Sequence, residues 1–102
     1  MIGLLKAKRH ELVELCRQYH VARLEVFGSA ATGEFDPDRS DLDLLVTFGQ
    51  VPSGERAHCF FGLQFALEDL FGRQVDLVEV EALRNPYFIA DINRSRELLH
   101  AA

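Results

Sequence analysis

The most informative stretch of this chain is Phe27-Gly28-Ser29, followed after residues 30–40 by Asp41-Leu42-Asp43-Leu44-Leu45-Val46. One apolar run ends at Gly28, and two alternating carboxylates open the next. Residues two apart on a strand project from the same face of a sheet, so the Cα atoms of Asp41 and Asp43 would lie about 6–7 Å apart. Two carboxylates this close repel each other unless a cation lies between them. The pair therefore predicts a metal site at the start of a strand, with oxygen ligands that favour Mg²⁺ or Mn²⁺.

A third carboxylate and a small turn extend this prediction. Asp76 interrupts the apolar run Val75-Asp76-Leu77-Val78, and it joins the acidic pair if the two strands are neighbours. The turn Gly28-Ser29 is followed by two alanines, so its backbone N–H groups and hydroxyl are free to hold phosphate oxygens. Taken singly, each motif is more typical of a plain turn or strand end. Together they predict metal-dependent phosphoryl transfer.

Hydrophobic periodicity predicts the order helix, strand, strand, helix, strand, helix. We expect helices over about 4–19 and 55–71, the second ending at Gly72, and a last helix from Asn85-Pro86 to about His100. We expect strands over about 23–27, 41–48 and 75–80. Residues 1–102 are then a single domain of the α/β (α+β) class, a small mixed β-sheet with helices packed on it.

Composition narrows the possible partners and location. The chain has 102 residues, is 48% hydrophobic and carries a formal net charge of -5. This charge argues against direct nucleic-acid binding through a basic face. Cys16 and Cys59 lie in apolar settings without metal-ligand spacing, which predicts two buried, reduced thiols. Because no signal segment or membrane-length apolar run is found, we expect a cytoplasmic protein without membrane contact.

The same residues resemble a known family. Phe27-Gly28-Ser29, the loop at Gly33, residues 40–46 and residues 75–78 are similar to the minimal nucleotidyltransferases (MNT) of the DNA polymerase β-like superfamily. The closing segments 85–88 and 96–99 look like the ending of one subgroup. The resemblance implies a nucleotidyltransferase (polymerase β palm-like) fold. It also implies site roles: Gly28 and Ser29 hold the nucleotide, Asp41 and Asp43 bind the metals, usually two Mg²⁺ ions, and Asp76 is a third metal ligand or a base.

The resemblance also implies a substrate and a partner. Members of the family are commonly the antitoxins of two-gene modules, and their partners, encoded nearby, resemble HEPN-type ribonuclease toxins. Some members transfer AMP from ATP to a tyrosine of the toxin, which makes them protein adenylyltransferases and silences the toxin. This chain differs at Ala30-Ala31, where many members carry a basic residue after the Gly-Ser pair. A cation from Arg39, Arg73 or Arg84 would be needed instead, although each is more typical of a plain surface charge.

Other functions fit parts of the sequence. One alternative is a catalytically weak or inactive antitoxin that neutralises the toxin by occlusion, for which Tyr87, Phe88 and Ile89 offer an apolar contact surface. Core packing is the commoner role for such residues. Transfer to a small molecule is a third possibility, although the chain is short for it. Template-directed polymerisation is disfavoured because the sequence has no basic channel.

Overall fold

The computed structural model describes residues 3–33, 36 and 41–102. In chain order, the elements are α1 (Gly3–Ala7), α2 (Arg9–Gln18), β1 (Val21–Phe27), α3 (Ser29–Thr32), β2 (Leu42–Phe48), α4 (Arg56–Phe71), β3 (Val75–Glu79), the 3-10 helix η1 (Val80–Ala82), α5 (Pro86–Ser95) and β4 (Glu97–Ala101). Most of the expected loop between Gly33 and Asp41, including Arg39, lies outside the described residues. Within the described part of the chain, every helix is too short or too polar to cross a membrane.

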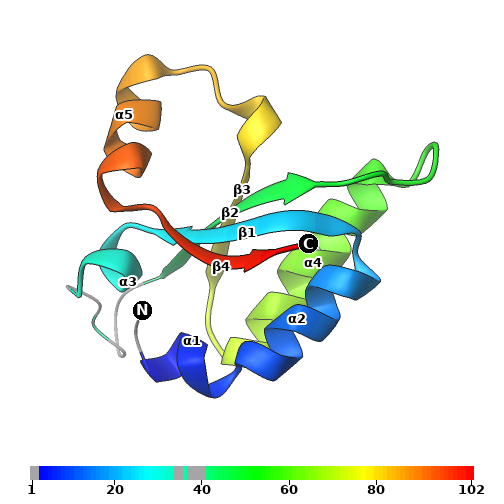
Figure 1. The fold of residues 1–102 in the computed structure, drawn as a ribbon, viewed down its shortest axis with the longest axis horizontal. Coiled ribbons are helices and arrows are strands. Elements are labelled where there is room, and N and C mark those ends of the chain that lie inside the picture. The colour runs from blue at the N-terminus through cyan, green and yellow to red at the C-terminus, as the bar shows by residue number, and fades with distance from the viewer. Residues whose placement is uncertain (1–2, 34–35, 37–40) are drawn as a thin grey trace.

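The four strands form one mixed sheet in the order β3-β2-β1-β4. Strand β1 is antiparallel to both β2 and β4, whereas β2 and β3 are parallel and are connected through α4. In Figure 1, α1, α2 and α4 cover one face of the sheet and α5 lies on the opposite side. The predicted α/β class with a mixed sheet is therefore confirmed.

The main core lies between the sheet and helices α1, α2 and α4. Alternate residues of β2 point into it, as the sequence predicts, and the helices add leucines and both cysteines: Leu42, Leu44, Val46, Phe48, Leu5, Leu12, Cys16, Cys59, Leu63 and Leu67. Both cysteines are free and buried, which confirms the predicted thiols, and burial raises the pKa of Cys16 to about 11. A Cβ at Gly62 would come within 2.6 Å of the Tyr19 ring, so glycine lets α2 and α4 approach closely.

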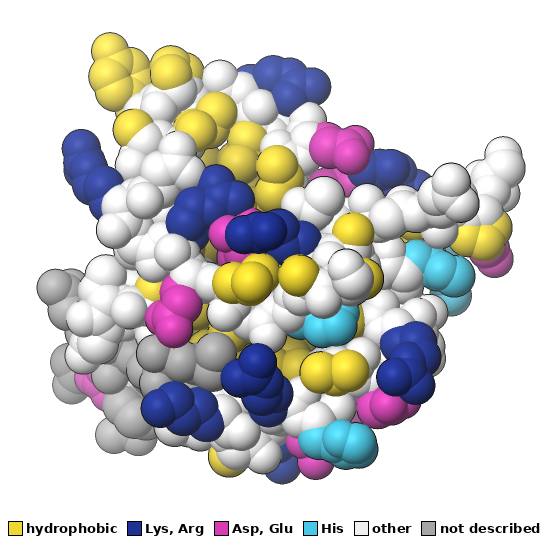
Figure 2. All heavy atoms as spheres, viewed as in Figure 1, with side chains coloured by type: hydrophobic (Ala, Val, Ile, Leu, Met, Phe, Trp, Pro, Cys, Tyr) yellow, Lys and Arg dark blue, Asp and Glu magenta, His cyan; other side chains and the backbone are white. Residues whose placement is uncertain are grey.

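A second, smaller apolar cluster lies on the other face of the sheet. It joins β1, β2 and α5 through Phe27, Leu45 and Ile92, with partly buried residues of β3 and η1 around them. Figure 2 shows hydrophobic side chains gathered between α5 and η1 on the face turned to the viewer. Leu45 and Asp43 are two residues apart on β2, so their side chains project from the same face of the sheet. This second face therefore also carries Asp43.

The first predicted helix is wrong in one respect. Residues 4–19 do not form a single helix, because Lys8 leaves helical geometry with a ψ of 16° and separates α1 from α2. The carbonyl of Lys8 accepts the N–H of Leu12 at 2.9 Å and starts the second helix. Leu5 in α1 and Cys16 in α2 both lie in the core.

The end of the chain differs more from the prediction. Asn85 does cap α5, since its Oδ1 accepts the N–H groups of Tyr87 at 2.9 Å and Phe88 at 3.3 Å. However, α5 ends at Ser95, and the residues expected to continue it to His100 form β4 instead. Leucine and glutamate favour helix locally. Pairing with the otherwise open edge of β1 outweighs that preference.

The aromatic start of α5 is more exposed than expected for core residues. Tyr87 is 86% exposed, so the prediction of core packing is wrong for it. Phe88 is 38% exposed, and its ring meets the edge of Phe27 with 6.2 Å between centroids. Ile89 is half-buried. This end of α5 therefore offers apolar side chains to a partner.

A buried ion pair connects the start of β4 to the centre of the sheet. Glu25 of β1 is only 3% exposed, and Arg96 donates to both of its oxygens, from Nε at 2.8 Å and from Nη2 at 2.7 Å. Arg23 adds a third bond at 3.2 Å. These hydrogen bonds, chiefly those from Arg96, lower the pKa of Glu25. Removing the cation would leave a carboxylate buried without a bidentate partner.

We therefore expect Arg96→Ala to lower the free energy of unfolding at pH 7 by about 3 kcal/mol. Because the pKa of Glu25 is lowered in the folded state, its contribution is present above the unfolded pKa of about 4.3 and is lost as the pH falls through the folded value. The difference from wild type should therefore shrink below pH 4. Urea unfolding at several pH values measures it.

Arg94→Ala is the matched control, because the Arg94–Asp91 pair is more than 70% exposed on both sides at 3.7 Å. It should change stability by less than about 0.5 kcal/mol. Equal effects of the two arginine variants would contradict a structural role for the buried pair.

Candidate active site

The pairing of β2 with both neighbours brings the predicted acids together. Asp43 lies opposite Phe27 of β1 on one side and opposite Asp76 of β3 on the other. Asp41 precedes β2 by one residue, and its negative charge, like that of Asp76, acts on Asp43. The conditional prediction, that Asp76 joins the pair if the strands are neighbours, is met by this register.

Gly28 is in direct contact with the central acid. It follows β1 with a φ of +69°, and a Cβ built there would lie 2.5 Å from Oδ2 of Asp43. Any larger residue would force the Asp43 carboxylate to move. The sequence predicts a turn at Gly28, but only the fold shows that the missing side chain makes room for Asp43.

The electrostatics of the acidic group are unfavourable for bare carboxylates. Burial raises the pKa of Asp43 to about 6, and the negative charges of Asp76 and then Asp41 add to the rise. Asp43 is half-buried, whereas Asp41 and Asp76 are exposed. A nearby cation would remove this repulsion and favour the ionised form.

This donor set fits a hard divalent cation such as Mg²⁺, which prefers oxygen ligands. In the ranges that the structure describes, no three His, Cys, Asp or Glu side chains converge closely enough to enclose an ion. Asp43 and Asp76 therefore lie side by side near the starts of β2 and β3 without forming a closed cage with Asp41. Such an open arrangement suits Mg²⁺, which is usually held by one or two carboxylates together with substrate phosphates.

The Gly28-Ser29 turn is held from both sides. Its first residue donates its N–H to Oγ of Ser95, at the end of α5, over 3.0 Å. The Gly28 carbonyl accepts the N–H groups of Ala31 at 3.1 Å and Thr32 at 3.2 Å and starts the single turn α3. Sequence reasoning missed Ser95, because it is 67 residues away and no spacing connects it to the turn.

The position of Ala30 explains the absence of a basic side chain there. Ala30 is 1% exposed and belongs to the main core, so a charged residue would be buried at this point. Among the arginines expected to compensate, Arg84 donates to the carbonyls of Glu81 at 2.7 Å and Leu83 at 2.8 Å in its own loop. Arg73 is half-buried in the turn ahead of β3.

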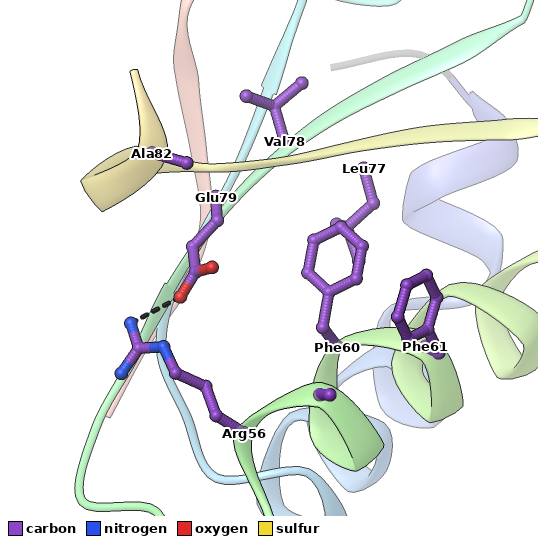
Figure 3. A pocket seen from close by; sticks show the side chains of 8 residues that line it. Arg56, Phe60, Phe61, Leu77, Val78, Glu79 and Ala82 are labelled. Carbon is purple, nitrogen blue, oxygen red and sulfur yellow. Dashed lines mark hydrogen bonds and ion pairs between the residues drawn. The ribbon is translucent and has the colours of Figure 1, made fainter. Parts of the chain in front are cut away.

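A mostly apolar cavity lies away from the three aspartates. It has a volume of about 590 Å³ and lies between α4 and the β3–η1 segment, where the Phe60 side chain points toward Leu77 (Figure 3). Its lining is mostly apolar, and the Arg56 side chain at its rim is ion-paired with Glu79. None of the three aspartates lines it. The predicted acids therefore lie apart from this cavity.

Comparison with known proteins agrees with this geometry. Residues 10–99 match the model of the nucleotidyltransferase domain family. The chain belongs to this family. The prediction of a minimal nucleotidyltransferase is thereby confirmed at the level of family and enzyme class.

Two relatives support this membership. The nucleotidyltransferase is 39% identical over 83 residues to protein adenylyltransferase MntA of Thermococcus cleftensis, covering 81% of this chain and 77% of the relative. It is also 39% identical over 80 residues to a Methanocaldococcus jannaschii protein whose name assigns it to the protein adenylyltransferases. That match covers 78% of this chain and 76% of the relative.

Solved structures share the fold. One described as a minimal nucleotidyltransferase has a TM-score of 0.75 at 36% identity, covering 94% of this chain and 95% of the other. A second contains a tri-AMPylated HEPN toxin of Shewanella oneidensis in complex with its MNT antitoxin. That match has a TM-score of 0.65 at 15% identity, covers 96% of this chain and 73% of the other, and shows likeness of fold alone.

Replacing Gly28 should disturb Asp43 specifically. In Gly28→Ala the new Cβ displaces the Asp43 carboxylate, and we expect Mn²⁺ affinity, measured by calorimetry, to fall at least about tenfold. Gly33→Ala is the control, because Gly33 also has a positive φ of 87° but has nothing within 4 Å of a built Cβ. Gly28, with a ψ of -148°, is in a region almost confined to glycine, whereas Gly33, with a ψ of 3°, is in the left-handed region that other residues adopt at a cost of about 1 kcal/mol, so Gly28→Ala also carries the larger backbone strain. Equal Mn²⁺ affinity in both would contradict the contact.

Asp43→Asn should stabilise the nucleotidyltransferase at neutral pH. The folded pKa of Asp43, about 6, lies above its ordinary value of 3.8, so wild type loses stability as the pH rises through this interval. We expect a gain of about 1 kcal/mol at pH 7, reduced from the full value because Asp43 is partly exposed. The gain should be complete above pH 6 and vanish below pH 4 in urea unfolding. A gain that does not change with pH would contradict the assignment, and Asp69→Asn, exposed on α4, is the control.

Proposed function

We propose that this nucleotidyltransferase is an antitoxin that transfers AMP from ATP to a tyrosine hydroxyl of a partner HEPN-type ribonuclease toxin. The observation that carries the proposal is the register that places Asp43 beside Asp76 and next to Gly28. The relatives named as protein adenylyltransferases support the reaction. The solved complex of an AMPylated HEPN toxin with an MNT antitoxin supports the class of partner.

The residues take these roles in the proposed reaction. Asp41, Asp43 and Asp76 would hold two Mg²⁺ ions, which neutralise phosphate charge and orient the nucleotide when bound. Gly28 shapes the turn, since its own N–H is donated to Ser95, and Ser29 binds the triphosphate through its backbone N–H and its hydroxyl. The acceptor oxygen bonds to the α-phosphorus, the bond to the β-phosphate oxygen breaks, and pyrophosphate leaves. As the alternative to holding a metal, Asp76, which is exposed, would act as the base that accepts the proton of the acceptor hydroxyl.

A second function, neutralisation by occlusion, has its own support. The side chains of Tyr87 and Phe88 present apolar area on α5, which suits contact with a partner. Residues 29–33 carry no basic side chain to neutralise a triphosphate. In this case binding of the toxin, and not chemistry, would silence it.

A transfer assay with ATP labelled on its α-phosphate, Mg²⁺ and the folded partner tests the proposal. We expect Asp41→Ala, Asp43→Ala and Asp76→Ala each to lower the transfer rate at least about 100-fold without unfolding the protein, because each removes a metal-binding carboxylate. Asp69→Ala removes an exposed carboxylate of α4 and should keep the wild-type rate.

Two outcomes would overturn adenylylation as the function. One is the absence of label on the partner with wild-type protein. The other is full neutralisation of the toxin by the Asp41→Ala, Asp43→Ala double variant, which would favour occlusion.

A further inference from the structure

Helix α5 and the residue that follows it hold the last residues of β1 through three separate contacts. Arg96 pairs with Glu25, Phe88 meets the Phe27 ring, and Ser95 accepts the N–H of Gly28. On the β1 side the partners are Glu25, Phe27 and Gly28, in chain order, so the contacts come progressively closer to Asp43. The last of them reaches the residue that lies against Asp43.

We infer that Ser95 is a positioning residue that fixes the Gly28 peptide for nucleotide binding. The inference rests on the proposed function. The β1–β4 ladder ends at the Val26–Glu97 pair, so the N–H of Gly28 lies beyond the last strand partner on that side. The hydroxyl of Ser95 supplies the missing acceptor at 3.0 Å.

The need for such a bond follows from the residue that it holds. Glycine occupies a far wider range of backbone conformations than other residues. At a φ of +69° and a ψ of -148°, Gly28 is in one of several conformations open to it. The bond to Ser95 on its N–H and the bonds from Ala31 and Thr32 on its carbonyl select one conformation. That conformation sets the direction of Ser29 and the distance to Asp43.

Ser95 is itself held in place on both sides. Ile92, which lies about one turn before Ser95 in α5, is 1% exposed. Its carbonyl accepts the N–H of Arg96 at 2.9 Å. The guanidinium of Arg96 is clamped by Glu25 and also donates to Oδ1 of Asn93 at 2.8 Å. The Ser95 hydroxyl is therefore presented by a fixed backbone, which is what a positioning group requires.

The test separates positioning from stability and uses three substitutions at Ser95. With ATP, Mg²⁺ and the folded partner, we expect Ser95→Ala to raise the KM for ATP about 5- to 10-fold while kcat stays within about twofold, because ordering the Gly28 peptide then opposes binding. Ser95→Thr keeps the hydroxyl and should restore the wild-type KM. Ser95→Cys keeps the size but is a weak acceptor, and it should give an intermediate value.

A direct readout does not depend on transfer. Hydrogen exchange of the Gly28 amide, followed by NMR, should be faster in Ser95→Ala and Ser95→Cys than in wild type or Ser95→Thr. Affinity for an ATP analogue with a methylene bridge between its α and β phosphates, measured with Mg²⁺, should fall in the same order. Ser53→Ala, in the exposed loop before α4, should leave both quantities unchanged.

The outcomes distinguish the two proposals. Faster Gly28 exchange with unchanged analogue affinity and unchanged KM would overturn the role of Ser95. If Ser95→Ala fails to fold, the folded Ser95→Cys variant decides by the same comparison. A wild-type protein that binds the analogue but transfers nothing to the partner would overturn the proposed function and leave the role of Ser95 to be judged by the binding and exchange data.

Discussion

Strand β2 is paired on both sides, and the register of its two ladders is the constraint on which the rest of the molecule depends. Its antiparallel pairing sets Asp43 opposite Phe27, and its parallel pairing sets Asp43 opposite Asp76. Because side chains alternate along a strand, a slip of one residue would turn Asp43 into the main core and Leu44 out of it. Burial of Leu42, Leu44 and Val46 therefore fixes the position of the acids as firmly as it fixes the core.

The site holds the negative charge of Asp43 in surroundings that disfavour it. Burial and two neighbouring carboxylates raise the pKa of Asp43, so an empty site is destabilised at neutral pH and a bound cation would relieve it. The opposite design is found at Glu25, which is more deeply buried but receives three hydrogen bonds from two arginines. Glu25 is neutralised by arginines of the protein itself, whereas half-buried Asp43 has two further carboxylates, those of Asp76 and Asp41, acting on it.

The elements at the end of the chain connect the sheet to the proposed nucleotide turn. Strand β4 covers the open edge of β1, and the junction before it carries both Arg96, which neutralises Glu25, and Ser95, which holds Gly28. The segment from Ser95 to Ala101, which local sequence preference predicts as the continuation of a helix, thus stabilises the centre of the sheet and supports the proposed site. This arrangement fits a small nucleotidyltransferase, in which few residues are available and several serve the core and the site together.

The sequence by itself determined the fold class, the apolar face of β2, the cap at Asn85 and the identity of the acids, because alternation, capping and charge repulsion are local properties that a spacing records. Tertiary structure alone decided three things. It broke the first helix at Lys8; it made β4 a strand, since pairing outweighs helix preference; and it brought Ser95 to Gly28. Each depends on contacts between segments distant in the chain, and the bond from Ser95 crosses 67 residues, a separation over which no local pattern carries information.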